Sequence, residues 1–291
     1  MLETQKKSFF YSPLRYPGGK NTLFPFVSNL IKENNYTNKI YAEPYAGGCG
    51  LALKLLFEDV VKEIYLNDFD YFIYSFWKTI LNETDIFCDW IQGLSIDMEN
   101  WFYFKKVLQY PDSYNQLEIA KATFFLNRCN VSGVIKGGVI GGKNQNGKYK
   151  IDARFNKTKL IEKIKLLATK RDVIHFSNLD ALDFLHSLKN LQSVFTYLDP
   201  PYFKKGSELY LNFYKEKNHE ELFNFLYSYK KDFILSYDNN DFIKNLYKNY
   251  SMYLFDISQS TSNKIGNEII IFSDNLNFEN SIKYLRSPIE L

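Results

Sequence analysis

The tetrapeptide at positions 199–202 carries the clearest chemistry in this sequence. It reads Asp199, Pro200, Pro201 and Tyr202, and it follows an apolar segment, SVFTYL, that predicts a buried strand. Two consecutive prolines fix the backbone and remove two N–H donors, so the turn presents a carboxylate and carbonyl oxygens beside an aromatic ring. These acceptors suit a planar group whose amino group has two hydrogens. The alternative is a strand-ending turn with a surface aspartate.

A second candidate, EPYAGGCG at 43–50, joins a short apolar strand to a segment at 51–59 with helical apolar spacing. A third predicted element, at 60–68, is a strand that ends in a carboxylate. The order is strand, glycine-rich turn, helix and strand, and open α/β sheets bind ligands at such turns. The sequence therefore predicts a ligand site at 43–50.

The glycine turn has features of a dinucleotide site, but the pattern is incomplete. Gly48 and Gly50 are followed about 20 residues later by Asp68, yet Leu53 stands where the third glycine belongs. Glu43 places a carboxylate near the turn, which disfavours a pyrophosphate and is compatible with a cationic or neutral nucleoside. Asp68 is placed to accept from ribose hydroxyls, and an N-cap of the next helix is the alternative.

The N-terminal motif RYPGGK at 15–20 superficially resembles a phosphate-binding loop. It departs from that pattern because Leu14 replaces a required glycine and Asn21 replaces the serine or threonine that binds magnesium. Taken alone, it predicts a basic turn before a helix.

The pattern of elements predicts an α/β domain interrupted by an insert. Strands and helices alternate over 1–75 and 170–291, whereas 76–169 is helical and then glycine-rich. Six glycines between 130 and 156 and an NGK turn signal favour a β-hairpin or a loop with polar side chains.

Composition excludes several classes of protein. The 291 residues are 45% apolar and 24% charged, as in ordinary globular proteins, and the net charge of +3 neither requires nor excludes nucleic acid. Three cysteines and three histidines lack metal-ligand spacing, and an odd cysteine count argues against a disulfide framework. We expect a cytoplasmic protein without a signal peptide or membrane span.

Together the three motifs, in this order, resemble the Dam-like, alpha-group DNA adenine-N6 methyltransferases, and the resemblance covers most of the chain. It implies the Rossmann-like sheet of an S-adenosyl-methionine-dependent methyltransferase, with an inserted helical and β-hairpin DNA-recognition domain. The implied activity is methyl transfer to the exocyclic amino group of an adenine flipped from duplex DNA, by a monomer. The recognition sequence and any partner restriction endonuclease stay open.

The resemblance also implies roles for single residues. Tyr16 and Lys20 would contact the cofactor, Asp68 its ribose and Asp180 the region of its adenine, although Asp180 also suits a helix N-cap. The full cofactor-binding set is Tyr16, Lys20, Glu43, Pro44, Gly47, Gly48, Gly50, Asp68, Asp180 and Asp199. The catalytic set is Asp199, Pro200, Pro201 and Tyr202, with the tyrosine ring stacking on the target base.

Basic and amide side chains concentrate in the glycine-rich part of the insert. In the major groove, arginine or lysine reads guanine and asparagine or glutamine reads adenine, while lysines also contact phosphates. The expected DNA-binding set is Arg128, Lys136, Asn144, Gln145 and Arg154, with Arg15 added by the resemblance. A solvated, lysine-rich loop is the alternative. Val131 departs from relatives that carry a wedging aromatic residue near this position.

Three other functions fit parts of the sequence. Pro-Pro-Tyr motifs also occur in enzymes that methylate an amino group of RNA or of a protein glutamine. A catalytically inactive DNA-binding relative would keep the insert without turnover. A nicotinamide-dependent oxidoreductase would use the glycine turn, and stabilisation by NAD rather than S-adenosyl-methionine would reveal it.

Overall fold

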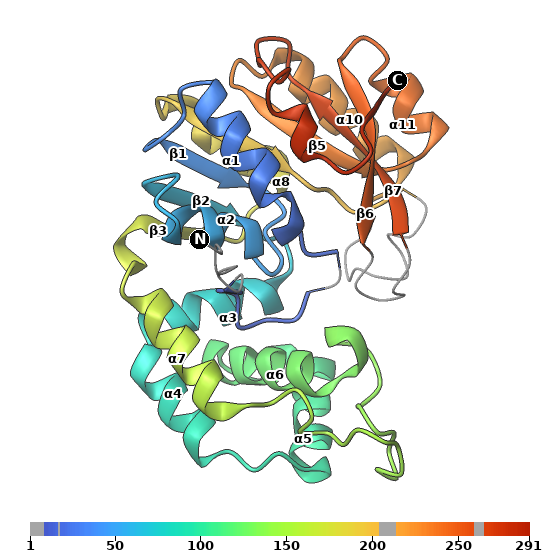
Figure 1. Ribbon diagram of the computed structural model, residues 1–291. Coiled ribbons are helices and arrows are strands. Elements are labelled where there is room, and N and C mark those ends of the chain that lie inside the picture. Colours follow the sequence, from blue (N-terminus) through green and yellow to red (C-terminus); the bar gives the residue numbers. More distant parts are fainter. Residues whose placement is uncertain (1–8, 17, 204–213, 259–264) are drawn as a thin grey trace, which may run out of the picture.

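The computed structural model describes residues 9–16, 18–203, 214–258 and 265–291. Within these residues, eight strands form one sheet in the order β3-β2-β1-β4-β5-β7-β6-β8 (Figure 1). The strands are β1 Ile40–Glu43, β2 Glu63–Asn67, β3 Ile174–Ser177, β4 Val194–Leu198, β5 Phe233–Asp238, β6 Met252–Ser258, β7 Ile265–Phe272 and β8 Ile289–Glu290.

The sheet reverses its winding between β1 and β4. Strands β3, β2, β1, β4 and β5 are parallel, and β7 runs antiparallel between β5 and β6. The pairing of Ala42 with Thr196 brings the carboxyl ends of β1 and β4 together. In open α/β sheets the crevice at such a switch point is where ligands bind.

Helices cover both faces of the sheet because alternate strand residues point to opposite sides. Tyr41 packs in the core that includes α1 and α2, whereas its neighbour Ala42 packs in the core that includes α8, α10 and α11. The helices are α1 Phe24–Glu33, α2 Gly50–Phe57, α3 Tyr71–Asn82, α4 Thr84–Gly93, α5 Met98–Gln109, α6 Gln116–Cys129, α7 Lys157–Ala168, α8 Ala181–Ser187, α10 Glu216–Ser228 and α11 Asp241–Leu246.

Helices α4 to α7 form a second lobe below the sheet (Figure 1). Three of these helices begin at a polar N-cap residue. Asp97, Asn115 and Asn156 accept hydrogen bonds from backbone N–H groups in the first turns of α5, α6 and α7, at 2.8 to 3.0 Å. Buried aromatic rings fill the interior, with Phe124 stacked on Phe76 of α3 at 5.6 Å. Helix α3 therefore joins the lobe to the sheet domain.

Of the two forms expected between 130 and 156, a β-hairpin or a loop, the structure has the loop. Asn130 and Val139 form one isolated antiparallel bridge, and the remainder is a series of turns and bends rather than a ladder. Short-range hydrogen bonds replace the ladder, as in Gly142 N–H to Val139 and Gly147 N–H to Gly141. The glycines and asparagines favour such local turns over paired strands.

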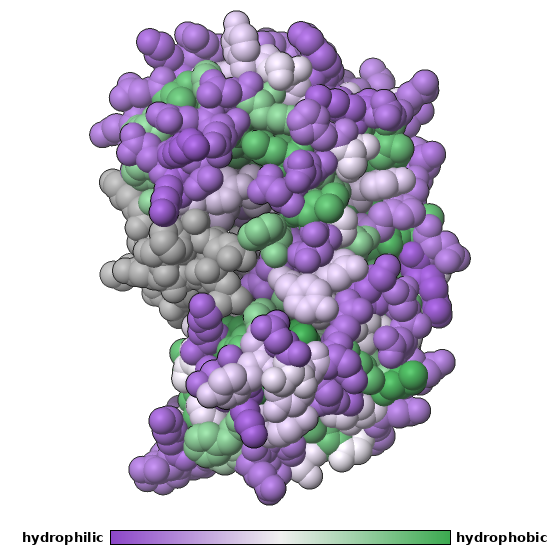
Figure 2. Space-filling model, turned by 180° about the vertical axis from the view of Figure 1, so that it is seen from behind, coloured by the Kyte–Doolittle hydropathy of each residue, from purple (hydrophilic) through white to green (hydrophobic). Residues whose placement is uncertain are grey.

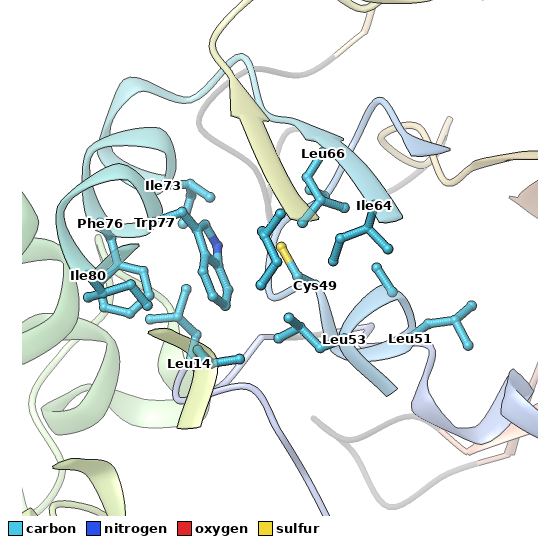
Figure 3. Close-up of a cluster of buried hydrophobic side chains, with 14 of the residues drawn as sticks. Leu14, Cys49, Leu51, Leu53, Ile64, Leu66, Ile73, Phe76, Trp77 and Ile80 are labelled. Atoms are coloured by element: carbon cyan, nitrogen blue, oxygen red, sulfur yellow. The ribbon is translucent and has the colours of Figure 1, made fainter. Parts of the chain in front are cut away.

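A dense apolar cluster lies beneath the glycine turn (Figure 3). Trp77 from α3 and Cys49 from the turn both point into this cluster, and each is about 1% exposed. The Trp77 indole Nε1–H also donates to the Gly47 carbonyl at 2.9 Å. The turn is thus fixed from below by packing and by a hydrogen bond.

The face opposite the view of Figure 1 is mostly polar, with hydrophobic residues scattered among polar ones (Figure 2). Among the described residues, no helix has the length and apolar character needed to cross a membrane.

Candidate active site

One cavity of about 500 Å³ lies at the carboxyl ends of β1, β2 and β4. Residues from the three sequence motifs line it, including Lys20, Gly48, Asp68 and Asp199. The parallel strands explain this convergence, because segments far apart in sequence end at the same edge of the sheet. Asp199 and Pro201 of the tetrapeptide therefore share one cleft with Gly48 and Gly50 of the glycine turn, whereas Gly47, Pro200 and Tyr202 lie outside its lining.

The N-terminal segment lies directly against the glycine turn. An added Cβ at Gly47 would lie 2.6 Å from the Tyr16 ring, and one at Gly48 would lie 2.7 Å from Tyr16 Cβ. At Gly50 the nearest atom would be the side-chain amide of Asn21, at 2.4 Å. Close approach to Tyr16 Cβ restricts Gly48, and a positive φ of 47° adds to the restriction at Gly47, whereas at Gly50 the Asn21 side chain would have to move. Tyr16 lines the cavity beside the turn.

Asp68 connects the end of β2 to the glycine turn. Its carboxylate accepts from the Gly47 N–H at 2.8 Å and from the Asp70 N–H at 2.9 Å. Burial, reinforced by the nearby Asp70 charge, raises the pKa of Asp68 to about 7. The side chain also lines the cavity, and its contact with a ribose stays a prediction.

Glu43 ends β1 and is 6% exposed. Its carboxyl group accepts from the Tyr41 hydroxyl at 2.8 Å. Burial is the main cause that raises the pKa of Glu43 to about 8, and the Asp199 charge adds to it. Pro44 follows, and its carbonyl accepts from the Asn67 side chain at 3.1 Å. Both Glu43 and Pro44 line the cavity.

Asp180 serves as the N-cap of α8. Its side chain accepts from the Leu182 N–H at 2.9 Å, and the residue is exposed at the rim of the cavity. Asp180 is therefore the N-cap that the sequence offered as the alternative, and it also lines the cavity. Contact with a cofactor stays a prediction.

Asp199 is held by two polar side chains, Lys20 and Ser236. Lys20 Nζ lies 3.2 Å from its Oδ1, and the Ser236 hydroxyl donates to the same oxygen at 2.6 Å. Burial raises the pKa of Asp199 even though Lys20 opposes the shift. Lys20 also pairs with Glu268 at 2.9 Å, so one ammonium serves two carboxylates.

The rest of the tetrapeptide is held by its neighbours. Pro200 is buried and Pro201 lines the cavity. The Tyr202 hydroxyl donates to Glu268 Oε1, and Lys20 Nζ donates to the Tyr202 oxygen at 3.1 Å. The orientation of the Tyr202 ring is thus set by two polar contacts at its tip.

Sequence reasoning missed Glu268 and Ser236, which contact the predicted residues directly. Glu268 lies in the strand sequence NEIIIF, where a carboxylate in an apolar strand is the available signal. Ser236 lies in β5 and is fully buried. A buried polar residue in a core strand needs a partner, and that requirement singles out both positions.

The predicted DNA-binding residues divide into two groups. Arg15 and Arg128 are partly buried, and their guanidinium groups donate to backbone carbonyls, Arg15 to Asn130 at 2.9 Å and Arg128 to Arg154 at 2.8 Å. Burial lowers the pKa of Arg128 to about 10. In this state both arginines connect the N-terminal segment to the second lobe.

The other group faces solvent. Lys136, Asn144 and Arg154 are exposed. Gln145, in contrast, uses its amide locally, donating to the Ile140 carbonyl at 2.9 Å. The solvent-facing side chains are therefore the ones available to a ligand without rearrangement.

The cysteines and histidines offer no competing chemistry. Cys49 is buried in the glycine turn, and burial raises its thiol pKa well above the ordinary value, which opposes thiolate formation. No group of three or more potential metal-ligating side chains occurs among the described residues.

The sheet order, the cavity at its switch point and the three motifs define an α/β methyltransferase with the Rossmann-like fold. The family model for D12 class N6 adenine-specific DNA methyltransferases matches residues 16–260, so the chain belongs to this family and is a DNA adenine methyltransferase.

The proteins to which the chain is similar include a curated methyltransferase and a solved structure. The type II methyltransferase M.MjaIII of Methanocaldococcus jannaschii is 26% identical over 208 residues, which cover 65% of this chain and 68% of that protein. Protein LPL1258 of Legionella pneumophila superposes with a TM-score of 0.36 and 12% identity, over 92% of this chain and 90% of that one.

Proposed function

We propose that this enzyme transfers a methyl group from S-adenosyl-methionine to the exocyclic amino group of an adenine extruded from duplex DNA. The observation that carries the proposal is the shared cavity, in which Asp199 faces the same space as the glycine turn. A donor bound at the turn and an amino group held at Asp199 would then meet within one enclosed site.

The lining of the cavity suits a cationic cofactor. It contains five carboxylates, at Glu43, Asp68, Asp70, Asp180 and Asp199, and two lysines, Lys20 and Lys215. Glu43 is protonated at neutral pH because burial raises its pKa to about 8, but the other four acidic side chains still outnumber the two lysines. This excess of acidic groups favours the sulfonium and ammonium groups of S-adenosyl-methionine and disfavours the pyrophosphate of a dinucleotide. When bound, this cofactor supplies an electrophilic methyl group. The residues proposed to hold it are Tyr16, Lys20, Glu43, Pro44, Gly47, Gly48, Gly50, Asp68, Asp180 and Asp199.

The contacts of Asp199 indicate how it would act. Oδ1 is occupied by Lys20 and Ser236, and among the described residues no hydrogen bond reaches Oδ2. We assign Oδ2 and the Pro200 carbonyl as acceptors for the two amino hydrogens. These hydrogen bonds would oppose delocalisation of the nitrogen lone pair into the adenine ring. The carboxylate also stabilises the positive charge that develops on nitrogen as the methyl group arrives.

The target amino group lies inside the DNA stack, so the base must leave the duplex. Extrusion costs a few kcal/mol, and stacking on an aromatic ring returns roughly 1–3 kcal/mol. We assign this stacking to Tyr202, whose hydroxyl is already fixed by Glu268 and Lys20. A ring held in place before the base arrives loses little freedom on binding.

The second lobe is the proposed target-recognition domain, with boundaries near 76 and 169. Its exposed Lys136, Asn144 and Arg154 fit phosphate and base-edge contacts. The similarity to M.MjaIII, a type II methyltransferase, supports a role in restriction–modification with a cognate endonuclease as partner. We expect the enzyme to act as a monomer in the cytoplasm.

Transfer of a labelled methyl group tests the proposal. Wild type should label duplex DNA in preference to RNA or protein, and S-adenosyl-methionine but not NAD should raise its melting temperature. Asp199→Ala should abolish labelling and remain folded, whereas Asp241→Ala, at an exposed position on α11, should label normally. Preferential labelling of RNA or protein, or full labelling by Asp199→Ala, would refute the proposal.

A further inference from the structure

A buried lysine joins the catalytic carboxylate to a second carboxylate in the middle of the sheet. Lys20 is 5% exposed, and its ammonium contacts Asp199 at 3.2 Å, Glu268 at 2.9 Å and the Tyr202 hydroxyl at 3.1 Å. The ammonium donates hydrogen bonds to the Tyr202 oxygen and to both Glu268 oxygens, and it forms an ion pair with Asp199.

Glu268 is an unusual residue for its place in the fold. It lies in β7, opposite Asp238 of β5 and Phe255 of β6, and is 5% exposed. A charge in such a place carries a large desolvation cost, and an apolar replacement is often at least as stable. The stability of the fold therefore does not explain a glutamate at position 268. Its two contacts, with Lys20 and with the Tyr202 hydroxyl, connect it to the catalytic tetrapeptide instead.

The charge balance shows what Glu268 changes. One ammonium between two carboxylates leaves a net charge of −1 in the cluster. Without the Glu268 charge, Lys20 would pair with Asp199 alone, and the cluster beside the target amino group would have no net charge. Burial makes this difference larger than it would be in water.

We propose that Glu268 is a positioning residue for methyl transfer: it shares the Lys20 ammonium with Asp199 and fixes the Tyr202 hydroxyl. The cluster thereby keeps a net negative charge beside the target amino group, and Tyr202 keeps the orientation needed to stack on the base. This inference rests on the proposed function.

The primary test is Glu268→Gln, which keeps the shape and removes the charge. We expect the single-turnover methylation rate to fall by about a hundredfold, a loss typical of removing one preorganised electrostatic group. The dissociation constants for S-adenosyl-methionine and duplex DNA should stay near their wild-type values. Glu268→Asp keeps the charge and should retain more of the rate than Glu268→Gln.

The matched control is Asp256→Asn on the neighbouring strand β6. Asp256 lies opposite Asn267, one residue from Glu268, but its carboxylate accepts from Asn267 outside the cluster. This variant removes the same charge and should methylate at the wild-type rate.

A double-mutant cycle tests the route through Lys20. If Glu268 acts mainly by sharing the ammonium, then Lys20→Met combined with Glu268→Gln should be little slower than Lys20→Met alone. Additive losses, a wild-type rate in Glu268→Gln, or a lower rate in Glu268→Asp than in Glu268→Gln would overturn the role of Glu268. An inactive wild-type enzyme would instead refute the proposed function.

Discussion

The buried carboxyl group of Glu43 predicts a pH-dependent stability that a single substitution removes. Burial raises its pKa from 4.5 to about 8. Between these values the folded protein holds a proton that the unfolded chain releases, so the free energy of unfolding decreases as pH rises. Glu43→Gln replaces the carboxyl group with a neutral amide, whose oxygen can still accept from Tyr41.

The size of the effect follows from the shift. At 1.36 kcal/mol for each pKa unit, the full shift corresponds to about 5 kcal/mol, and about 3 kcal/mol of it falls between about pH 5.5 and pH 8.5. Wild type should lose this amount relative to Glu43→Gln over that interval. The comparison isolates Glu43 because the raised pKa values of Asp68 and Asp199 act in both proteins.

Urea unfolding of both proteins at several pH values measures the difference. The difference obtained by subtracting the free energy of unfolding of Glu43→Gln from that of wild type should decrease steadily as pH rises. It should level off above about pH 8. A difference that stays constant across this interval would show that Glu43 ionises normally in the folded protein.

Three further predictions concern the tetrapeptide, the DNA surface and the joint between the two lobes. Tyr202→Ala should lower kcat/KM on duplex DNA by about ten- to a hundredfold through loss of stacking, and unchanged turnover would leave Tyr202 a structural role alone. Lys136→Ala and Arg154→Ala should each weaken DNA binding and reduce the slope of log K against log salt concentration by about one, with cofactor affinity preserved. Fluorescence anisotropy across salt concentrations measures this slope, and a DNA affinity equal to that of wild type would contradict the prediction. Asn127→Leu removes the amide that binds both the N–H and the carbonyl of Arg15 at 2.8 and 2.7 Å, so unfolding should become easier by about 3 kcal/mol, and an unchanged urea midpoint would contradict this.

The parts of the site that the sequence predicted depend on local rules. The glycine turn, Asp68 and the tetrapeptide each follow a short apolar strand, and parallel strands end at a common edge, so the convergence of Asp68 and Asp199 follows from their positions in the chain. The glycines at 47 to 50 also follow from a tight turn, although their close contact with Tyr16 and Asn21 needs the folded structure.

The parts that the sequence did not predict depend on long-range contacts. Glu268 lies 248 residues from Lys20, and its neighbours in NEIIIF indicate only a buried strand. Arg15 and Arg128 have the charge of DNA-binding residues, but backbone carbonyls from distant segments occupy their guanidinium groups. The sequence left a β-hairpin and a loop open at 130–156, and the structure has the loop, because a glycine-rich sequence satisfies its backbone through local turns as readily as through a ladder.

Identification of modified bases in DNA from cells that express this chain tests whether Asp199 directs adenine methylation. We expect N6-methyladenine within a defined sequence for wild type, and unmodified DNA for Asp199→Ala expressed at the same level. Methyl groups on cytosine, or N6-methyladenine at wild-type levels in the Asp199→Ala cells, would contradict this expectation.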